Sequence, residues 1–337
     1  TELVRRAWYL AQPGYSRYFM KLPASTRWVF APHHMAHAAS AYYASPFEEA
    51  AVLVVDGMGE WPVTSLYRGV GNRLEPLGQI SFPHSLGFYY SAFTEYLGFN
   101  PFDGEYKVMG MAAYGEPRFE AEFGDILRLE ERGRHRLNLR YFNFHRDYGR
   151  TTWYSPRLVD TFGPPSSSTE QPEQYYIDLA ASVQKRLEDA LFHLVDYLYE
   201  QTGSRNLCMA GGVALNSVAN GKIMQRGPFE HLFVQPAAND SGTALGAAQY
   251  AHHCTLGKQD REPMQHVYYG PAYGTDEIEA MLRHSMVAYE EVEQPAEVAA
   301  ELLAQGKIVG WFQGRMEFGP RALGNRSILA DPRQAVM

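Results

Sequence analysis

The chain has 337 residues, of which 45% are hydrophobic and 20% charged. This is the composition of a soluble globular protein of about two domains rather than of a disordered or fibrous one. Lys and Arg number 30 against 38 Asp and Glu, for a formal net charge of -8, so no overall basic field is available for nucleic acid or an anionic membrane. Apolar runs such as residues 50–55 are far shorter than the roughly 20 residues of a membrane helix. We therefore expect neither a nucleic-acid partner nor a membrane span.

The first 30 residues mix arginine, tyrosine, proline and serine, without the apolar core or cleavage pattern of a secretory signal. Only Cys208 and Cys254 are present, which argues against a disulfide framework and against a cysteine-based zinc site. Together these features predict a protein of the reducing cytoplasm.

The predicted elements begin with a short helix over 33–44, which Pro32 precedes and Pro46 ends. The next segment, 50–55, is continuously apolar and rich in β-branched residues, as a strand buried on both faces should be. Asp56 and the glycines that follow it turn this strand sharply.

Further elements follow from apolar periodicity and from turn residues. They are strands at 63–68 and 74–80 that extend the sheet in antiparallel fashion, a helix at 86–97, a glycine-punctuated functional loop entering a helix at 103–115, a mixed insertion or inter-lobe region at 116–172, a long helix at 172–201, a strand at 206–209, a helix from about 214, a strand at 232–235, a helix at 241–252, helices around 281–282 and 298–304, and a strand at 308–312. Strands and helices alternate after residue 206, which predicts an α/β fold.

His33 and His37 form the first candidate site. On a helix their imidazoles lie one turn apart on the same face and can reach one metal ion, whereas His34 points elsewhere. Alone the pair is weak evidence, because a capping imidazole beside a half-buried one is a common structural arrangement. The absence of a His-Glu-x-x-His motif argues against a zinc peptidase.

Asp56 and Asp240 are candidate partners of these histidines. Asp56 ends a buried strand, where open α/β sheets place ligand-contacting residues; the alternative is a turn aspartate bonded to backbone amides. Asp240 lies at a strand-to-helix junction, where the alternative is a helix N-cap. Two histidines and one or two aspartates suit a divalent metal with open positions, such as Fe(II), Mn or Zn, and the mixture does not choose among them.

Glycine turns beside these positions suit phosphate groups. Gly57 and Gly59 would let backbone approach a phosphate closely. Gly211 and Gly212 lie between a predicted strand and a predicted helix, where bare backbone and a helix N-terminus suit a nucleotide. This pair is neither a Walker A loop nor a G-x-G-x-x-G motif, so by itself it is a weak signal.

The order of these pieces resembles the actin-like ATPase and sugar-kinase superfamily, in which Asp-Gly turns face phosphates and a Gly-Gly turn holds adenosine. The histidine pair narrows the resemblance to the O-carbamoyltransferases of the NodU/CmcH/TobZ family, relatives of the hydrogenase-maturation carbamoyltransferase and the tRNA threonylcarbamoyl transferase. Six stretches carry it in family order over nearly the whole chain: 33–42, 55–60, 104–115, 211–216, 239–246 and 310–327.

The resemblance implies a domain organisation. It predicts an α/β, two-lobed actin-like (ASKHA) carbamoyl-transfer domain over 1–255, a connecting region over 256–306 and the start of a YrdC-like α/β domain over 307–337. A hairpin whose His-Asp pair supplies a proposed catalytic base would precede residue 1. Most of the carbamoyladenylate-forming YrdC-like domain would follow residue 337.

The resemblance also implies residue roles. The metal ligands would be His33, His37, Asp56 and Asp240, with iron the expected ion. Lys107 and Asp56 are the catalytic candidates, since Lys107 could pair with phosphate or polarise the carbamoyl group; the alternative for Lys107 is a solvated surface lysine. Residues expected to face nucleotide or phosphate are Gly57, Gly59, Gly211, Gly212, Asn216, Gly242, Arg315, Arg321 and Arg326, with Asn325 a further polar candidate. Guanidinium groups suit phosphate, although at least one of these arginines is expected to be structural.

The implied chemistry runs in two steps. Carbamoyl phosphate and ATP, the latter with Mg, give carbamoyladenylate, and the carbamoyl group then passes to an acceptor hydroxyl on a small molecule such as an antibiotic or a sugar. A metal would act as a Lewis acid. Two alternatives are an ATP phosphotransferase of the sugar-kinase type and a non-catalytic lobe that binds nucleotide or metal. The sequence leaves open the acceptor's identity and whether the protein is a homodimer.

Overall fold

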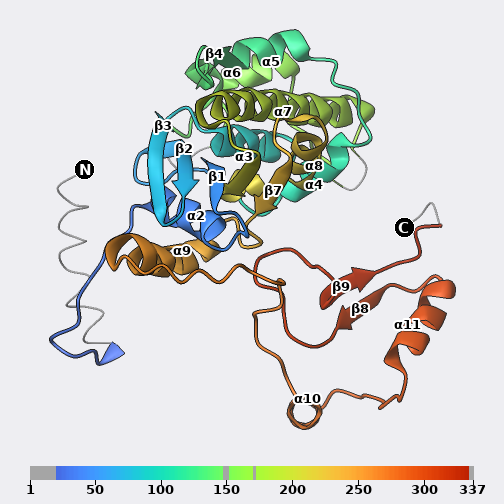
Figure 1. The fold of residues 1–337 in the computed structure, drawn as a ribbon. Coiled ribbons are helices and arrows are strands. Elements are labelled where there is room, and N and C mark those ends of the chain that lie inside the picture. The colour runs from blue at the N-terminus through green and yellow to red at the C-terminus, as the bar shows by residue number, and fades with distance from the viewer. Residues whose placement is uncertain (1–19, 147–151, 170–171, 334–337) are drawn as a thin grey trace.

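The structure is a computed structural model that describes residues 20–146, 152–169 and 172–333. Most of the segment in which a secretory signal was sought, residues 1–19, lies outside this range. At the centre is a mixed five-stranded sheet of order β3-β2-β1-β6-β7 (Figure 1). Its strands are β1 (Glu49–Val55), β2 (Pro62–Val70), β3 (Arg73–Ser81), β6 (Asn206–Ala210) and β7 (His231–Val234). β2 pairs antiparallel with β1 and β3, whereas β6 is parallel to both β1 and β7. The predicted α/β class is confirmed.

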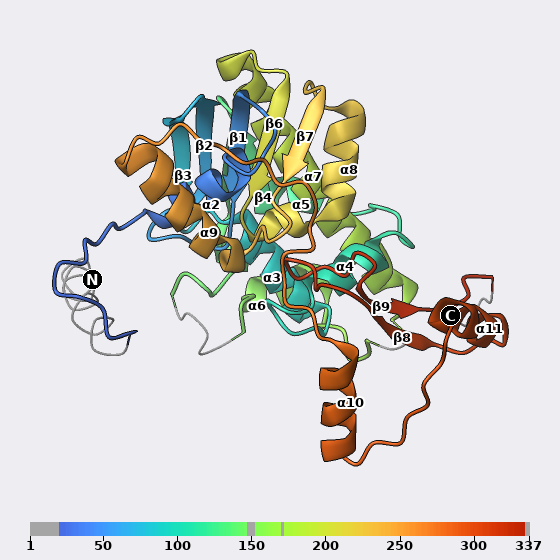
Figure 2. The same ribbon diagram turned by 60° about the horizontal axis from the view of Figure 1, so that its bottom comes forward.

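β1 is the central strand, and its alternate side chains enter two separate hydrophobic clusters. Ala51, Leu53 and Val55 pack with α3 (Leu86–Tyr96) and α7 (Gln174–Thr202) on one face. Ala50, Val52 and Val54 pack with α2 (His33–Tyr42) on the other face, where α9 (Thr243–Gln249) lies beside α2 (Figure 2). Because both faces are covered, β1 has the continuous apolar run that predicted it.

The predicted mixed region at 116–172 contributes to the core. It contains α5 (Glu120–Ile126), the hairpin of β4 (Leu127–Glu130) and β5 (Arg134–Leu137), the 3-10 turn η1 (Leu139–Tyr141) and α6 (Pro156–Phe162), and it follows α4 (Glu105–Ala112). Phe123, Phe142 and Phe162 are buried around Phe93 of α3, with ring centroids 5.0 to 6.4 Å from that ring. Aromatic packing therefore joins this region to the sheet layer.

Two predicted helices begin differently in the structure. The segment after β6 first forms a 3-10 turn, η2 (Gly212–Leu215), and α8 (Ser217–Arg226) starts only after Asn216, whose side chain accepts a hydrogen bond from the Ala219 N–H. The helix predicted at 241–252 is a 3-10 turn, η3 (Asp240–Gly242), followed by α9 and a π-helix, η4 (Tyr250–Thr255).

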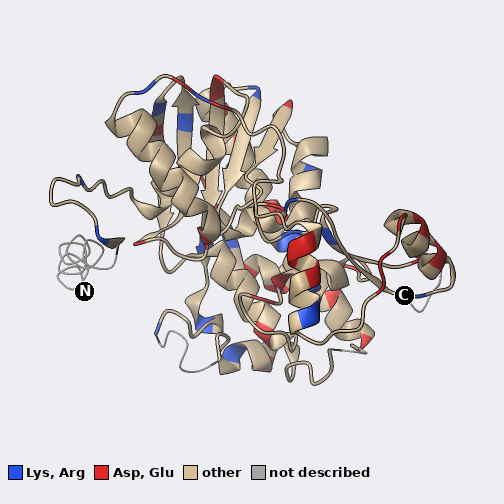
Figure 3. Cartoon of the chain, turned by 90° about the horizontal axis from the view of Figure 1, so that it is seen from below, with Lys and Arg blue, Asp and Glu red and all other residues tan. Residues whose placement is uncertain are grey.

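The remaining residues form α10 (Thr275–His284), α11 (Pro295–Ala304) and an antiparallel pair of β8 (Val309–Phe312) and β9 (Arg326–Leu329), drawn in orange and red in Figure 1. Acidic residues lie in the first turns of α10 and α11, and the cartoon in Figure 3 shows acidic and basic residues interspersed along the chain. None of the described helices is both long and apolar enough to cross a membrane. The predicted domain boundaries at 255 and 306 stay a prediction.

Candidate metal centre

Four side chains predicted as metal ligands converge on one point. The Nε2 atoms of His33 and His37 are 3.1 Å apart. His33 Nε2 lies 3.2 Å from Asp56 Oδ2 and 3.3 Å from Asp240 Oδ1, and His37 Nε2 lies 3.7 Å and 3.4 Å from the same two oxygens. All four ligand atoms lie within 4.8 Å of one another. The cluster could therefore hold a metal ion, although the role of each residue stays a prediction.

Three parts of the fold position these groups. The two histidines lie one turn apart on the first half of α2, Asp56 directly follows β1, and Asp240 opens η3 before α9. Because α2 packs on β1 and against α9, the three segments meet at the carboxyl end of the central strand. His37 is fully buried, whereas the Asp240 side chain is 75% exposed. The cluster is thus closed on the protein side and open toward solvent at Asp240.

The two carboxylates raise the pKa values of the two histidines in the cluster. Hydrogen bonds to Asp240 and Asp56 raise the pKa of His33 to about 10. Burial opposes protonation of His37, but the same two carboxylates raise its pKa overall. Burial likewise opposes ionisation of Asp56, yet hydrogen bonds from the two histidines hold the pKa of its carboxyl well below the usual range, and those histidines also lower the pKa of Asp240. In the metal-free chain the histidines therefore carry the protons.

A metal ion fits this donor set. Two protonated imidazole nitrogens that face each other at 3.1 Å repel each other, and both already point at carboxylate oxygens. A cation at the shared point would replace the protons on these nitrogens and bind all four side chains. Two nitrogen and two oxygen donors suit Fe(II), Mn or Zn. The buried Nδ1 of His37 has no hydrogen-bond partner among the described residues, so Nε2 is the atom committed to the cluster.

His34 and Ser85 lie beside the cluster without supplying a ligand atom to it. His34 turns away from the cluster as predicted, with its Nδ1 2.8 Å from the Ser65 hydroxyl, and burial lowers its pKa to about 3. The Ser85 hydroxyl donates to the carbonyls of Asp56 and Gly57 while capping α3. Sequence reasoning missed Ser85; the position before the predicted helix at 86–97 was its only signal.

The glycine turns lie beside the cluster. The Gly212 N–H donates to Asp56 Oδ1 at 2.8 Å, which joins the turn after β6 to the turn after β1. Gly211 has φ +93°, and a Cβ there would lie 2.2 Å from the Val55 carbonyl oxygen, so only glycine fits. A Cβ at Gly242 would meet the Ala237 carbonyl oxygen at 2.1 Å. These close approaches exclude side chains whether or not a nucleotide binds.

Gly57 and Gly59 are restricted by packing. A Cβ at Gly57 would lie 2.9 Å from Phe88, and a Cβ at Gly59 would lie 2.7 Å from the His34 ring. Asn216 has both ends of its amide engaged, since Nδ2 donates to Gln184 Oε1 while Oδ1 accepts from Gln184 Nε2 and from α8. The nucleotide-binding roles of these residues stay predictions.

Lys107 lies outside the metal cluster. It is exposed on the first turn of α4, and its Nζ is 5.8 Å from the ring centroid of Tyr106. The Arg321 Cζ atom lies 6.0 Å from the centroid of the same Tyr106 ring, and the Arg321 guanidinium donates to the Leu215 carbonyl of η2. The structure thus places Arg321 beside the glycine turn, and Lys107 contacts the same Tyr106 ring as Arg321.

The other two candidate arginines are engaged with the backbone. Arg315 donates to the carbonyls of Tyr269 and Gly270, and Arg326 donates to the Gly319 carbonyl. Arg326 also lies 3.2 Å from the buried carboxylate of Glu317. The expectation that some of these arginines are structural agrees with these contacts, whereas Arg321 is the one that reaches the glycine turn.

Glu317 is a residue that sequence reasoning missed. Its Oε1 accepts hydrogen bonds from the backbone N–H groups of Leu323, Asn325 and Arg326. Burial would raise the pKa of this carboxyl, but the backbone donors lower it to about 2. The carboxylate therefore organises the whole glycine- and arginine-rich loop between β8 and β9.

Comparison with known proteins places the chain in a family. A model of the carbamoyltransferase N-terminus matches residues 13–249, and a model of the carbamoyltransferase C-terminus matches residues 300–337. The chain belongs to the carbamoyltransferase family, which confirms the resemblance seen in its motifs.

Its curated relatives include nodulation proteins. An uncharacterized protein of Synechocystis is 47% identical over 92% of this chain and 51% of its own length. Nodulation protein NolNO of Sinorhizobium fredii is 41% identical over 91% of this chain and 44% of its own, and nodulation protein NolO of Bradyrhizobium diazoefficiens is 38% identical over 90% and 54%. The chain spans about half the length of these relatives.

Among solved structures, HypF of T. kodakarensis covers 72% of this chain and 39% of its own, with 14% identity and a TM-score of 0.38. A full-length HypF in the phosphate- and nucleotide-bound form covers 70% and 44%, with 15% identity and a TM-score of 0.36.

Proposed function

We propose that the chain is the carbamoyl-transfer part of an ATP- and metal-dependent O-carbamoyltransferase. The protein would move a carbamoyl group from carbamoyl phosphate, via carbamoyladenylate, to a hydroxyl of a small molecule such as an antibiotic or a sugar. The observation that carries the proposal is the convergence of two imidazoles and two carboxylates at one point, in a member of the carbamoyltransferase family.

His33, His37, Asp56 and Asp240 would hold a divalent ion, with Fe(II) the one the family resemblance favours. When bound, such an ion polarises a carbonyl or holds phosphate oxygens as a Lewis acid. The protein's own contribution is positional. The Gly212 N–H fixes Asp56 Oδ1, which leaves Oδ2 for the cluster, and the exposure of Asp240 leaves a side on which a substrate can enter.

The glycine turn and the two nearby cations would hold the nucleotide. The turn at Gly211 and Gly212 brings backbone without side chains beside Asp56, to which the Gly212 N–H donates, and the Tyr106 ring contacts both Lys107 and Arg321. Both cations suit phosphate oxygens, Lys107 as a point charge and Arg321 as a planar fork. Mg²⁺ would accompany ATP.

We infer that the domain around the five-stranded sheet is actin-like and that residues 307–337 begin a YrdC-like domain. Support for the first inference comes from the placement of the Asp-Gly and Gly-Gly turns after adjacent parallel strands β1 and β6, which are the motifs on which the resemblance rests. A cytoplasmic location, with small-molecule partners only, belongs to the same proposal.

The test is to assay metal content and carbamoyl transfer in Asp56→Ala and His37→Ala variants, with His34→Gln as the matched control on the same helix. We expect both ligand variants to lose metal and transfer, and the control to keep them. Unimpaired carbamoylation by either ligand variant would refute the proposal. Mass spectrometry of the product separates the alternatives, because a kinase adds a phosphoryl group and a binding lobe yields no product.

A further inference from the structure

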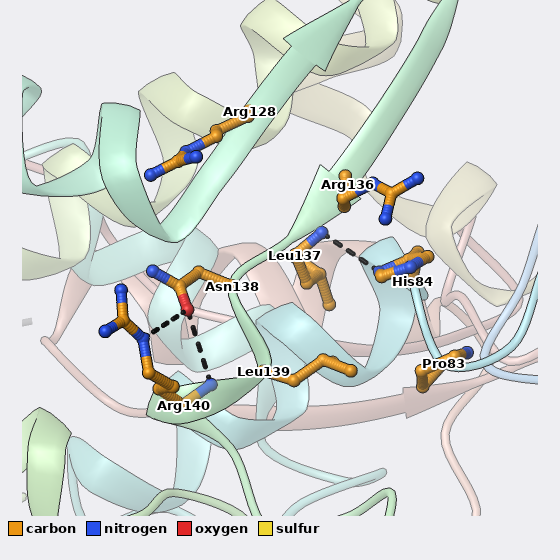
Figure 4. Close-up of a pocket in the computed structure, with 8 residues that line it drawn as sticks. All are labelled: Pro83, His84, Arg128, Arg136, Leu137, Asn138, Leu139 and Arg140. Carbon is orange, nitrogen blue, oxygen red and sulfur yellow. Dashed lines mark hydrogen bonds between the residues drawn. The ribbon is translucent and has the colours of Figure 1, made fainter.

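A second polar site lies away from the metal cluster, where the β4–β5 hairpin meets η1 and the loop before α3. A surface cavity of about 370 Å³ opens there, and its wall contains the side chains of Arg128, Arg136, Arg140 and His84. Figure 4 shows these residues with Asn138 and with the apolar side chains that complete the wall. None of them belongs to the metal cluster, and neither the family resemblance nor the proposed function uses them.

The hairpin places like charges opposite each other at this cavity. Arg128 and Arg136 are direct cross-strand partners in the β4–β5 register, so their side chains leave the same face. Like charges in such positions destabilise a hairpin. The buried face of the hairpin carries Leu127 and Leu137 instead, so the arginine pair is held at the cavity by the packing of the opposite face.

Carboxylates neutralise this cluster only in part. Arg128 forms an ion pair with Asp125, and Arg136 forms one with Glu130 at 2.9 Å. Arg140 donates to Asn138 Oδ1 at 3.3 Å but forms no ion pair with a carboxylate in the part of the chain that the structure describes. Three guanidinium groups thus line the cavity, and two of them are paired with carboxylates.

His84 adds a neutral donor. Its Nδ1 accepts the Leu137 N–H at 3.2 Å, so the ring proton resides on Nε2, which has no partner among the described residues. Burial, followed by the charge of Arg136, lowers the pKa of His84, which keeps the ring neutral near pH 7. The His84 carbonyl is bonded in turn to buried His135 at 2.9 Å. The loop is therefore anchored to the hairpin at two points.

We propose that this arginine pocket binds an oxyanion group of phosphate, sulfate or carboxylate type carried by a small molecule. Guanidinium groups bind such groups through paired, charge-assisted hydrogen bonds, and Arg140 has no carboxylate partner among the described residues that would compete with an anion. His84 also directly precedes Ser85, whose hydroxyl donates to the carbonyls of Asp56 and Gly57.

The test is calorimetric titration of the purified chain with inorganic phosphate, sulfate and acetate, each against potassium chloride at matched ionic strength. Arg136→Gln and Arg140→Gln are the pocket variants. Arg205→Gln is the matched control, since it removes the same charge from an exposed ion pair with Glu230. We expect at least one oxyanion to bind, and each pocket variant to weaken it about tenfold or more while the control leaves it unchanged.

Thermal unfolding supplies a second measurement that a purely structural role of the arginines would not produce. The bound anion should raise the Tm of wild type and of Arg205→Gln, and this increase should vanish in Arg136→Gln, whose own Tm without anion stays equal or rises because the like-charge pair is gone. The proposal is overturned if chloride gives the same shift, if the pocket variants and the control respond alike, or if none of the three anions binds at roughly 10 mM.

Discussion

The region around the sheet and the C-terminal segment after residue 255 are stabilised in different ways. In the first, two hydrophobic clusters cover both faces of β1 and include fully buried aromatic residues such as Tyr89, Phe93 and Phe123. In the second, Ala299 is the only buried hydrophobic side chain among the described residues. Large apolar side chains such as Met281, Phe312 and Ile328 are instead exposed there.

The C-terminal segment is organised by polar contacts and by its attachment to the sheet region. Glu317 orders the loop between β8 and β9 through backbone hydrogen bonds. Gly319 lies so close to the β7–η3 loop that a Cβ there would meet the Pro236 carbonyl oxygen at 2.3 Å, and Arg321 binds the Leu215 carbonyl.

The two regions contribute unequally to the stability of the fold and to the candidate metal site. Burial of apolar surface is the dominant favourable term in folding, so the sheet region holds most of the stability and also builds the whole metal cluster. The C-terminal segment takes its order from that region and adds Arg321 to the edge of the site.

The largest effect should come from a metal ligand. His37→Ala removes a fully buried proposed ligand, and we expect specific metal binding to be lost, a larger effect than the roughly 10–100-fold penalty of altering an outer-shell partner. Arg321→Ala, in the C-terminal segment, should leave metal affinity unchanged. Titration with Fe(II) or Zn(II) measures both. Equal losses in the two variants would show that the C-terminal segment helps to build the cluster.

The next largest effect should be on stability, because a core residue is well packed in the sheet region and not in the C-terminal segment. Phe93→Ala should lower the free energy of unfolding by about 3–5 kcal/mol, because it opens a cavity among packed rings. Phe312 is 48% exposed, and Phe312→Ala should change the same quantity by about 0.5 kcal/mol or less. Denaturant unfolding followed by circular dichroism is the measurement. Similar losses of unfolding free energy in the two variants would contradict the conclusion that the sheet region holds most of the stability.

A smaller and local effect is expected at Glu317. Glu317→Gln weakens charge-assisted hydrogen bonds to the backbone, so amide exchange within residues 317–326 should accelerate about tenfold, while exchange in β1 and β6 stays unchanged. Glu301→Gln, an exposed position on α11, is the matched control. Hydrogen exchange with mass spectrometry measures the effect, and faster exchange in β1 would mean that the two regions unfold together.

The smallest effect should be a dependence of stability on pH in the metal-free chain. The pKa of His33 is raised from 6.5 to about 10, so its folded state holds a proton that the unfolded state releases. The stabilisation is therefore complete below pH 6.5 and is lost as the pH rises toward about 10. Thermal unfolding with EDTA should show the Tm difference between wild type and His33→Gln shrinking over this range. A constant difference would contradict the assigned protonation.

Much of the site could be predicted from local sequence. Helical spacing placed His33 and His37 on one face, and the apolar run before Asp56 identified the central strand. Asn216 and the aromatic residues at 116–172 could not be placed in the same way, because their partners are distant in sequence: Asn216 pairs with Gln184 on α7, and Phe123 packs on Phe93 of α3.

By itself the sequence determined the α/β class, the order of the main elements, the four candidate ligands and the family to which the chain belongs, because periodicity and motif order are properties of neighbouring residues. Only the tertiary structure decided that the four ligands meet, that Arg321 and Lys107 share the Tyr106 ring while Arg315 and Arg326 bind the backbone, and that arginines of one hairpin gather at a cavity. Each of these depends on distances between segments far apart in the chain, which packing sets and local pattern does not record.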